Sequence, residues 1–167
     1  MTDDLDLLNA DDLVDLYGSV PPLKDIRLRS INMNWRGPTI TLRVDISSFP
    51  AEPPQDWEYA EVDTVQCHLQ FLAVENFSLS DWDPPTPSAS LVVTPLKKDR
   101  KVQIRLTGIG VDLCFTSHES VRVGHVSAFR SAPDGTDGGP HLFLRNLDRR
   151  RHTTVPETEE KTFYERI

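Results

Sequence analysis

The stretch from Ile26 to Ile46 decides the fold, and it reads IRLRSINMNWRGPTITLRVDI. In residues 39–46, apolar and polar side chains alternate strictly, which is typical of a β-strand with one buried face. Before that, the phase of the alternation slips by one residue, which predicts a β-bulge near residues 29–30. Arg36-Gly37-Pro38 supplies the turn, so the whole stretch predicts an antiparallel hairpin.

Further strand patterns follow along the chain, with turn residues between them. Apolar residues alternate from Val65 to Phe71, and the phase slips again before Phe77 and Leu79. Thr107-Gly108 links two later segments closely enough for a tight hairpin. The remaining predicted strands span residues 91–94, 102–106, 109–115, 121–125 and, as a last short one, 142–144. Short strands in this succession favour an antiparallel sheet.

The first eighteen residues predict a helix with one apolar face. Gly18 is suited to end this helix, and Pro21-Pro22 cannot continue it, because proline lacks the backbone N–H that a helix needs. The aspartates of this segment fall on the other face. The apolar face is predicted to consist of Leu5, Leu8, Leu13, Leu16 and Tyr17.

Together these patterns predict a mainly β (α+β) protein, an antiparallel β-sheet domain that is sandwich- or barrel-like and carries one N-terminal α-helix. At 167 residues, the chain has the length of a single domain, residues 1–167. Within it we expect the helix over 1–18, the β core over 26–130, and a loop with a C-terminal extension over 131–167. The predicted buried face of the sheet contains Leu42, Val44, Leu69, Phe71, Val111 and Leu113.

Charge is distributed unevenly over the chain. The net charge is −8, and the first fifteen residues supply six aspartates and no base, whereas a small basic cluster lies near the other end. A protein that neutralises phosphates would be expected to show a basic face, so nucleic acid is excluded as the expected ligand. A cationic partner suits the acidic balance, because complementary fields speed encounter. The aspartates are Asp3, Asp4, Asp6, Asp11, Asp12 and Asp15; the bases are Arg145, Arg149, Arg150 and Arg151.

The compartment is predicted from what the sequence lacks. Cys67 and Cys114 stand far apart and outside any CxxC or Cys/His spacing, which favours a reduced pair over a disulfide. The first residues show no basic segment followed by an apolar one, and no apolar run approaches 18 residues. We therefore expect a cytoplasmic protein with no membrane partner, which needs neither metal nor disulfide to fold.

No catalytic pattern stands out, and the sequence predicts no enzyme and no cofactor. Cys67 shares the apolar phase of its strand and is expected in the core, while His68 falls in the opposite phase and is expected to face solvent. His125 continues an apolar phase and suits a core imidazole. No two histidines have the spacing of a metal site. The glycine-rich residues 134–139 resemble a calcium loop only superficially, and an ordinary turn is expected there.

Two features favour binding. The first is the acidic N-terminal segment, whose aspartates are alternatively no more than the solvated face of an amphipathic helix. The second is the proline-rich segment 47–62 together with Trp82, since aromatic side chains on rigid loops make good interface anchors. Here the alternative is that Trp57, Tyr59 and Trp82 cover the ends of the sheet. The candidate partner-binding residues are therefore the six aspartates, Trp57, Tyr59 and Trp82.

The order of several motifs resembles the immunity protein 50 family of bacterial polymorphic toxin systems. Leu16-Tyr17-Gly18 and the strand pattern of residues 26–35 resemble the opening of that family. Residues 37–43, GPTITLR, resemble its most characteristic strand. The segments that carry the rest of the resemblance, which covers roughly residues 13–129, are 65–71, 74–79 and 121–123. These are strand and turn patterns, so the resemblance carries over no binding residues.

The resemblance implies a cytoplasmic antidote that binds and neutralises a cognate toxin. An acidic surface placed over a basic toxin site is the mechanism that the charge favours. Two other functions are carried as alternatives: a non-catalytic β module that binds a small molecule or peptide, and a hydrolase built from scattered histidines and acids. A large apolar cavity would favour the β module, and a filled core would favour the antidote. The sequence leaves the toxin and the oligomeric state open.

Overall fold

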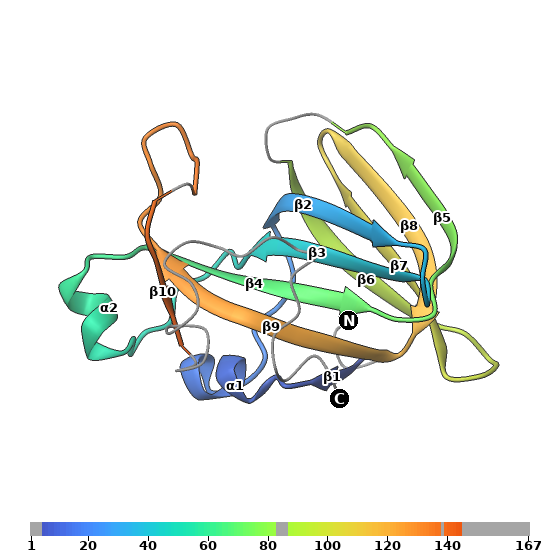
Figure 1. Cartoon of the computed structure of the whole chain (residues 1–167), viewed down its shortest axis with the longest axis horizontal. Helices are drawn as coiled ribbons and strands as arrows, with labels where there is room; N and C mark the ends of the chain where they lie inside the picture. Colours follow the sequence, from blue (N-terminus) through green and yellow to red (C-terminus); the bar gives the residue numbers. More distant parts are fainter. Residues whose placement is uncertain (1–4, 83–86, 138, 145–167) are drawn as a thin grey trace.

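The computed structural model describes residues 5–82, 87–137 and 139–144, and within them the chain is mostly β (Figure 1). The helices are α1 (Asp11–Tyr17) and α2 (Gln55–Tyr59). The strands are β1 (Asp6–Leu8), β2 (Ile26–Asn34), β3 (Thr39–Asp45), β4 (Thr64–Phe71), β5 (Glu75–Ser80), β6 (Ser88–Pro95), β7 (Lys101–Gly108), β8 (Val111–His118), β9 (Ser120–Phe129) and β10 (His141–Phe143). The predicted fold class is confirmed.

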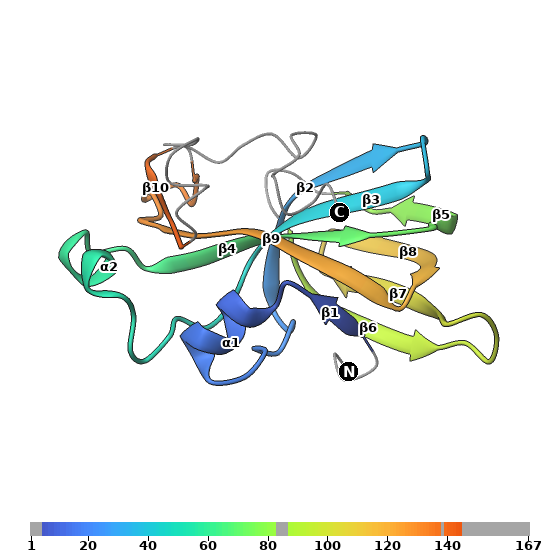
Figure 2. The same ribbon diagram turned by 60° about the horizontal axis from the view of Figure 1, so that its bottom comes forward.

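The strands form one sheet that folds over into two layers, in the order β1-β9-β4-β3-β2-β6-β7-β8-β5, with β10 pairing β9. Figure 2 shows the strands of the first layer, β1 to β2, and those of the second, β6 to β5. Phe71 of β4 and Phe115 of β8 meet edge to face with ring centroids 5.1 Å apart, although their strands are not neighbours. This contact therefore crosses between layers, and the architecture is a sandwich and not a closed barrel.

The predicted bulge in β2 is present and helps the strand to serve both layers. The β2–β3 register shifts between Leu28 and Ser30. Before the shift, Ile26 and Arg27 also pair with the start of β6, while residues after the shift pair with β3 alone. A bulge bends a strand and increases its twist, which lets β2 leave the second layer and continue along the first.

The core lies between the layers and has the predicted composition. The six residues predicted to form the buried face of the sheet are all at most 1% exposed. Burial of apolar surface contributes about 25 cal/mol per Å², so this alternating face is the main source of stability. The prediction from strand phase is confirmed at Leu42, Val44, Leu69, Phe71, Val111 and Leu113.

The N-terminal segment differs from the predicted single helix. Residues 6–8 form β1, which pairs in parallel with β9, so the sheet is mixed and not purely antiparallel. Asn9 takes a left-handed conformation with φ of 62°, and α1 starts only at Asp11. Gly18 ends α1 as predicted, with φ of 79° and its N–H bonded to the Val14 carbonyl. Pairing with a strand more than a hundred residues away overrides the helical spacing of the first leucines.

One loop, one turn and the last short strand also differ from prediction in detail. The segment 47–62, expected to be irregular, contains α2, whose five residues are too few to give a periodic pattern. In the β7–β8 hairpin, Gly108 pairs with Val111, so the turn residues are Ile109 and Gly110 and not Thr107-Gly108. Ile109 is consequently 97% exposed and does not continue the buried phase of β8. The last short strand exists, but Phe143 and His141 are its buried residues.

Candidate functional site

The outer side of the first layer is polar, and much of it is buried. In β3 and β4, Arg43 lies opposite His68, and Asp45 lies opposite Gln66. All four side chains alternate with the apolar residues of the core and so point away from it. Asp45, Gln66 and His68 are only 4%, 1% and 3% exposed. A buried polar face needs internal partners, because an unpaired polar group costs about 1–3 kcal/mol.

Arg29 and Asp45 supply the most buried of these partnerships. Arg29 stands at the bulge in β2, and its Nε and Nη2 donate to Asp45 Oδ2 at 2.8 and 2.6 Å. Gln66 Nε2 donates to the other oxygen, Oδ1, at 2.8 Å. The guanidinium also lies over the ring of Phe129, 5.6 Å from its centroid. The bulge therefore places a cation where three strands surround it.

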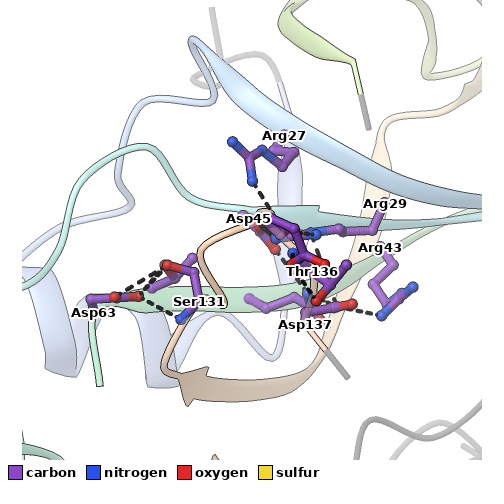
Figure 3. A network of polar contacts seen from close by, with 12 residues as sticks. Arg27, Arg29, Arg43, Asp45, Asp63, Ser131, Thr136 and Asp137 are labelled. Atoms are coloured by element: carbon purple, nitrogen blue, oxygen red, sulfur yellow. Dashed lines mark hydrogen bonds and ion pairs between the residues drawn. The ribbon is translucent and has the colours of Figure 1, made fainter. Parts of the chain in front are cut away.

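Asp137 fastens the loop that follows β9 onto this face (Figure 3). Its Oδ2 accepts from Arg43 Nη1 at 2.6 Å and from Gln66 Nε2 at 2.8 Å. Burial alone would raise the pKa of Asp137, but the hydrogen bond from Gln66 and the charges of Arg43 and Arg29 outweigh it and hold that pKa below its usual range. Arg29 Nη1 adds a bond of 2.7 Å to the Gly135 carbonyl. The loop is thus attached at two points.

His141 completes the attachment from β10. Its Nε2 lies 2.9 Å from the Asp137 carbonyl, which can only accept, so Nε2 carries the proton and Nδ1 accepts from Ser127 Oγ at 3.0 Å. The ring stacks on Phe129 with centroids 4.6 Å apart. Burial lowers the pKa of His141 from 6.5, against the raising effect of its bond to Asp137. The imidazole therefore serves as a neutral link between loop and sheet.

A small pocket opens beside this network, where the start of β2, the end of β3 and the start of β4 meet. Its volume is about 250 Å³. Ser131 closes one side, donating from its N–H and its hydroxyl to Asp63 at 3.0 and 3.1 Å. The lining consists of Asp25, Arg27, Asp45, Ile46, Ser47, Thr64 and Ser131. All but Ile46 are polar, with formal charges of both signs.

The prediction that His68 faces solvent is wrong. His68 is 3% exposed, and His125 packs against it with ring centroids 4.7 Å apart. His125 has φ of 49°, an uncommon conformation for a residue with a side chain, beside the register shift between β4 and β9. That shift turns the imidazole of His125 toward the polar face, where it covers His68. The alternation of residues within β4 could not show this burial, because it depends on a bulge in the neighbouring strand β9.

Of the acidic residues predicted to bind a partner, those of α1 lie toward the same end of the molecule as α2. Asp3 and Asp4 lie outside the described residues, and Asp6 accepts from the Ser120 hydroxyl at 3.0 Å. Asp11 and Asp12 occupy the first turn of α1, and Asp15 follows on the same helix. Both views place α1 and α2 at the same end, where Tyr59 is 79% exposed. Further acids of α2 and its flanks are Glu52, Asp56, Glu58 and Glu61.

The other two aromatic candidates do not join this acidic end. Trp57 is fully buried, with its ring 6.4 Å from that of Phe49, so it supports α2 and presents no surface to a partner. Trp82 is 37% exposed and lies two residues after the end of β5, a strand that is drawn on the side away from α2 (Figures 1 and 2). The structure thus places α2, which carries Tyr59, toward the same end as α1, whereas Trp82 follows a strand of the second layer.

The network around Arg29 and Asp137 was not predicted from the sequence. Its signal was present as charged and amide residues in the polar phase of two strands, Arg43, Asp45 and Gln66, but the loop residue that joins them is distant in sequence. Among the described residues, no three His, Cys, Asp or Glu side chains gather in a way that would hold a metal ion. Nor does this part of the chain contain a helix long and apolar enough to cross a membrane.

Comparison with known proteins now bears on these surfaces. No curated protein and no solved structure matches the chain. A family described as Immunity protein 50 matches residues 9–127, a span that starts before α1 and ends within β9. The match includes α1, α2, strands β2 to β8 and most of β9. The chain therefore belongs to the immunity protein 50 family.

Proposed function

We propose that the chain is an immunity protein that binds a cognate secreted toxin in the cytoplasm of the producing cell and blocks it by stoichiometric occlusion, without catalysis. The observation that carries this proposal is the family match over residues 9–127. The matched elements are strands and turns of a scaffold, as suits a protein that acts by presenting a surface.

The surface proposed for the toxin is the acidic end, formed by α1 and α2. Asp11 and Asp15 of α1 are exposed there, as are Glu52 and Glu58 at α2, and Tyr59 is 79% exposed. An exposed tyrosine on a short helix that also carries exposed acids suits a protein contact, since the aromatic ring anchors the contact and the charges speed encounter. A basic toxin surface is the complement of this arrangement.

The two alternative functions have less support. A site for a small apolar ligand is typically mostly apolar and about 300–1,000 Å³ in volume, whereas the described pocket measures about 250 Å³ and is lined almost entirely by polar groups. A hydrolase would need the buried acids and His141 to have oxygen or nitrogen atoms available to a substrate. Asp45, Asp137 and His141 instead form hydrogen bonds within the fold. Asp45 accepts from Arg29, Asp137 accepts from Arg43, and His141 bonds the Asp137 carbonyl.

The test is protection of cells. The first step is to identify a large secreted protein encoded beside this chain, whose C-terminal domain is then expressed in a sensitive cell with and without the chain. Survival only in the presence of the chain, together with a one-to-one complex of the two purified proteins, is the expected result.

A matched pair of variants connects protection to the proposed surface. Tyr59→Ala at the acidic end should weaken the complex at least tenfold, while Ile109→Ala, at an even more exposed residue of the β7–β8 turn, should leave it unchanged. If wild-type chain neither protects nor binds, the immunity function is wrong. If it protects but both variants bind normally, the toxin contacts a different surface.

A further inference from the structure

The polar pocket at the start of β2 and β4 is lined by hydroxyl groups whose protons are already used within the fold. Ser47 Oγ donates to the Lys24 carbonyl at 2.8 Å. Thr64 Oγ1 donates to Asp63 Oδ1 at 2.7 Å, and Ser131 Oγ donates to the same oxygen at 3.1 Å (Figure 3). A hydroxyl has one proton to donate and two lone pairs. These three side chains can therefore only accept a further hydrogen bond from a group in the pocket.

Two carboxylates of the lining add further acceptors. Asp45 receives two hydrogen bonds from Arg29 and one from Gln66, whereas a carboxylate can accept about four. Asp25 is exposed, and none of the residues that the structure describes donates to its carboxylate. The lining therefore has unused acceptor capacity at both acids, and most of it is at Asp25.

Of the described side chains that line the pocket, Arg27 alone still has N–H groups to donate. Its Nη1 lies 3.3 Å from the Gly135 carbonyl, so the guanidinium is held against the loop that follows β9. The formal charge of the lining is −1, from Asp25 and Asp45 against Arg27, but Arg29 compensates Asp45 from behind. Charge alone therefore decides little, and the excess of acceptors over donors decides which ligand fits.

We propose that this pocket binds the cationic head group of one lysine or arginine side chain, which forms an ion pair with Asp25 and donates its other N–H groups to the hydroxyl oxygens around it. An ammonium has three donors and a guanidinium has five, and neither accepts a hydrogen bond. The volume of about 250 Å³ is below the roughly 300–1,000 Å³ of sites for drug-sized ligands. It therefore suits one long side chain.

The walls of the pocket are held in place by bonds within the fold. The Asp25 N–H donates to Ser90 Oγ at 3.1 Å, which joins the start of β2 to β6. The Ser131 N–H donates to Asp63 at 3.0 Å, and Asp45 is fixed by its buried ion pair. A site whose groups are already ordered loses little conformational entropy on binding. A single head group can therefore bind measurably.

The position of the pocket favours a protein as the source of the head group, a step that rests on the proposed immunity function. Ser47 and Thr64 lie on either side of the segment that carries α2, whose exposed acids suit a basic toxin surface. A lysine or arginine that extends from such a surface would reach the pocket at the base of the same segment. Basic side chains held in a pocket, arginine above all, are common anchors of protein contacts.

Titration of the full chain with capped amino acids, followed by ¹H–¹⁵N NMR, tests the pocket without the toxin. The probes are N-acetyl-arginine methylamide and N-acetyl-lysine methylamide. At least one should bind saturably with a Kd of about 0.1–10 mM, as expected for one charged group, and should shift the amide signals of Asp25, Thr64 and Ser131 most. N-acetyl-glutamate methylamide, which has the same backbone and an anionic head, should not bind.

Three variants identify the groups that bind the probe. Asp25→Asn should raise the Kd at least fivefold, because it removes the partner charge, and Arg27→Gln should lower it, because it removes a like charge. Asp99→Asn is the matched control and should leave the Kd unchanged. Asp25 and Asp99 are both exposed and both left-handed, with φ of 53° and 61°, a conformation that asparagine also tolerates.

The proposal would be overturned if neither cationic probe gave saturable shifts up to about 50 mM. Tighter binding of the glutamate probe, strengthened by Asp25→Asn and weakened by Arg27→Gln, would instead identify an anion site. Equal effects of Asp25→Asn and Asp99→Asn on the Kd would also refute the role of Asp25, because they would reflect net charge alone.

Binding of the toxin is a separate readout that identifies the source of the head group. Asp25→Asn should weaken the toxin complex at least fivefold, whereas Asp99→Asn should not. A wild-type chain that binds the cationic probes but no toxin would refute the immunity function and leave a free cation as the ligand. A toxin that binds Asp25→Asn as tightly as wild type would refute the toxin as the source, while the immunity function would stand.

Discussion

Arg29 and Asp45 form an ion pair that is almost completely removed from solvent, with 3% and 6% of their side chains exposed and Nη2 2.6 Å from Oδ2. Arg29 stands at the bulge by which β2 changes layers, and Asp45 ends β3. The pair therefore holds together the point at which the sheet folds over. The cost of desolvating both charges makes such a pair a weak source of net stability, yet losing one partner leaves a buried charge uncompensated.

Removing Asp45 should therefore destabilise the fold strongly. We expect Asp45→Ala to lower the free energy of unfolding by about 3–5 kcal/mol, because Arg29 would stay buried without its counter-charge. Urea denaturation followed by circular dichroism measures the loss. Asp112→Ala is the control, since its partner Arg105 is 56% exposed and such a pair is worth about 0–1 kcal/mol. Equal losses in both variants would contradict this account of the pair.

Shortening a side chain in the core between the layers should destabilise the fold, because it leaves a cavity. Phe71→Ala and Leu69→Ala are each expected to lower the free energy of unfolding by about 2–5 kcal/mol, because both side chains are at most 1% exposed. Val92→Ala, at half exposure on β6, should change it by less than about 0.5 kcal/mol. Losses below about 1 kcal/mol at both core positions would show that the site collapses around the missing atoms.

Stability should fall as pH drops through the titration of His141. Burial lowers its pKa in the folded chain, so between that value and 6.5 the unfolded chain binds a proton that the folded chain does not. The contribution of the neutral ring is complete above pH 6.5 and is lost below it. Urea midpoints of wild type and His141→Gln, measured from pH 7.5 to 5, should converge as pH falls. A constant difference across that range would mean that His141 does not titrate differently in the two states.

The fold should need neither a metal ion nor a disulfide. Both cysteines are free thiols, and burial raises the pKa of Cys67 to about 12, with the nearby Asp45 carboxylate adding to the effect. A chelator and a reductant should each leave the thermal midpoint unchanged. Iodoacetamide at pH 8 should spare Cys67 in the folded chain and modify it in urea. A midpoint that drops by many degrees with either reagent would refute the prediction.

The acidic helix should act on the rate of toxin association. Replacing Asp11 and Asp15 with asparagine is expected to slow association and flatten its salt dependence, with little change in dissociation, because long-range attraction acts before contact. Surface plasmon resonance at several salt concentrations measures both rates, and screening over about 10 Å at 0.1 M salt should erase the difference. Asp81→Asn with Asp99→Asn removes the same charge outside α1 and α2 and should have little effect. If all six N-terminal aspartates can be neutralised with no change at low salt, they are only a solvated face.

The sequence by itself determined which side chains face the core. The apolar phase of residues 39–46 and 65–71 requires those faces to be buried, because a strand that slipped by one residue would expose all of them. The phase slip in β2 likewise predicted a bulge at the residue pair where one is found. Gly18 ended α1 for a similarly local reason, since only a left-handed residue closes the helix there.

Tertiary structure decided what these faces meet. Residues 6–8 became a strand because β9 offered an unpaired edge, which outweighed their helical spacing. The polar phase of β3 and β4 became a buried network because Asp137, from a loop some seventy to ninety residues later, pairs with Gln66 and Arg43. Local sequence encodes the alternation that decides which face of a strand is buried, because residues close together in the chain set that alternation. Which charge or strand edge a side chain meets depends on contacts between distant segments, and only folding brings those segments together.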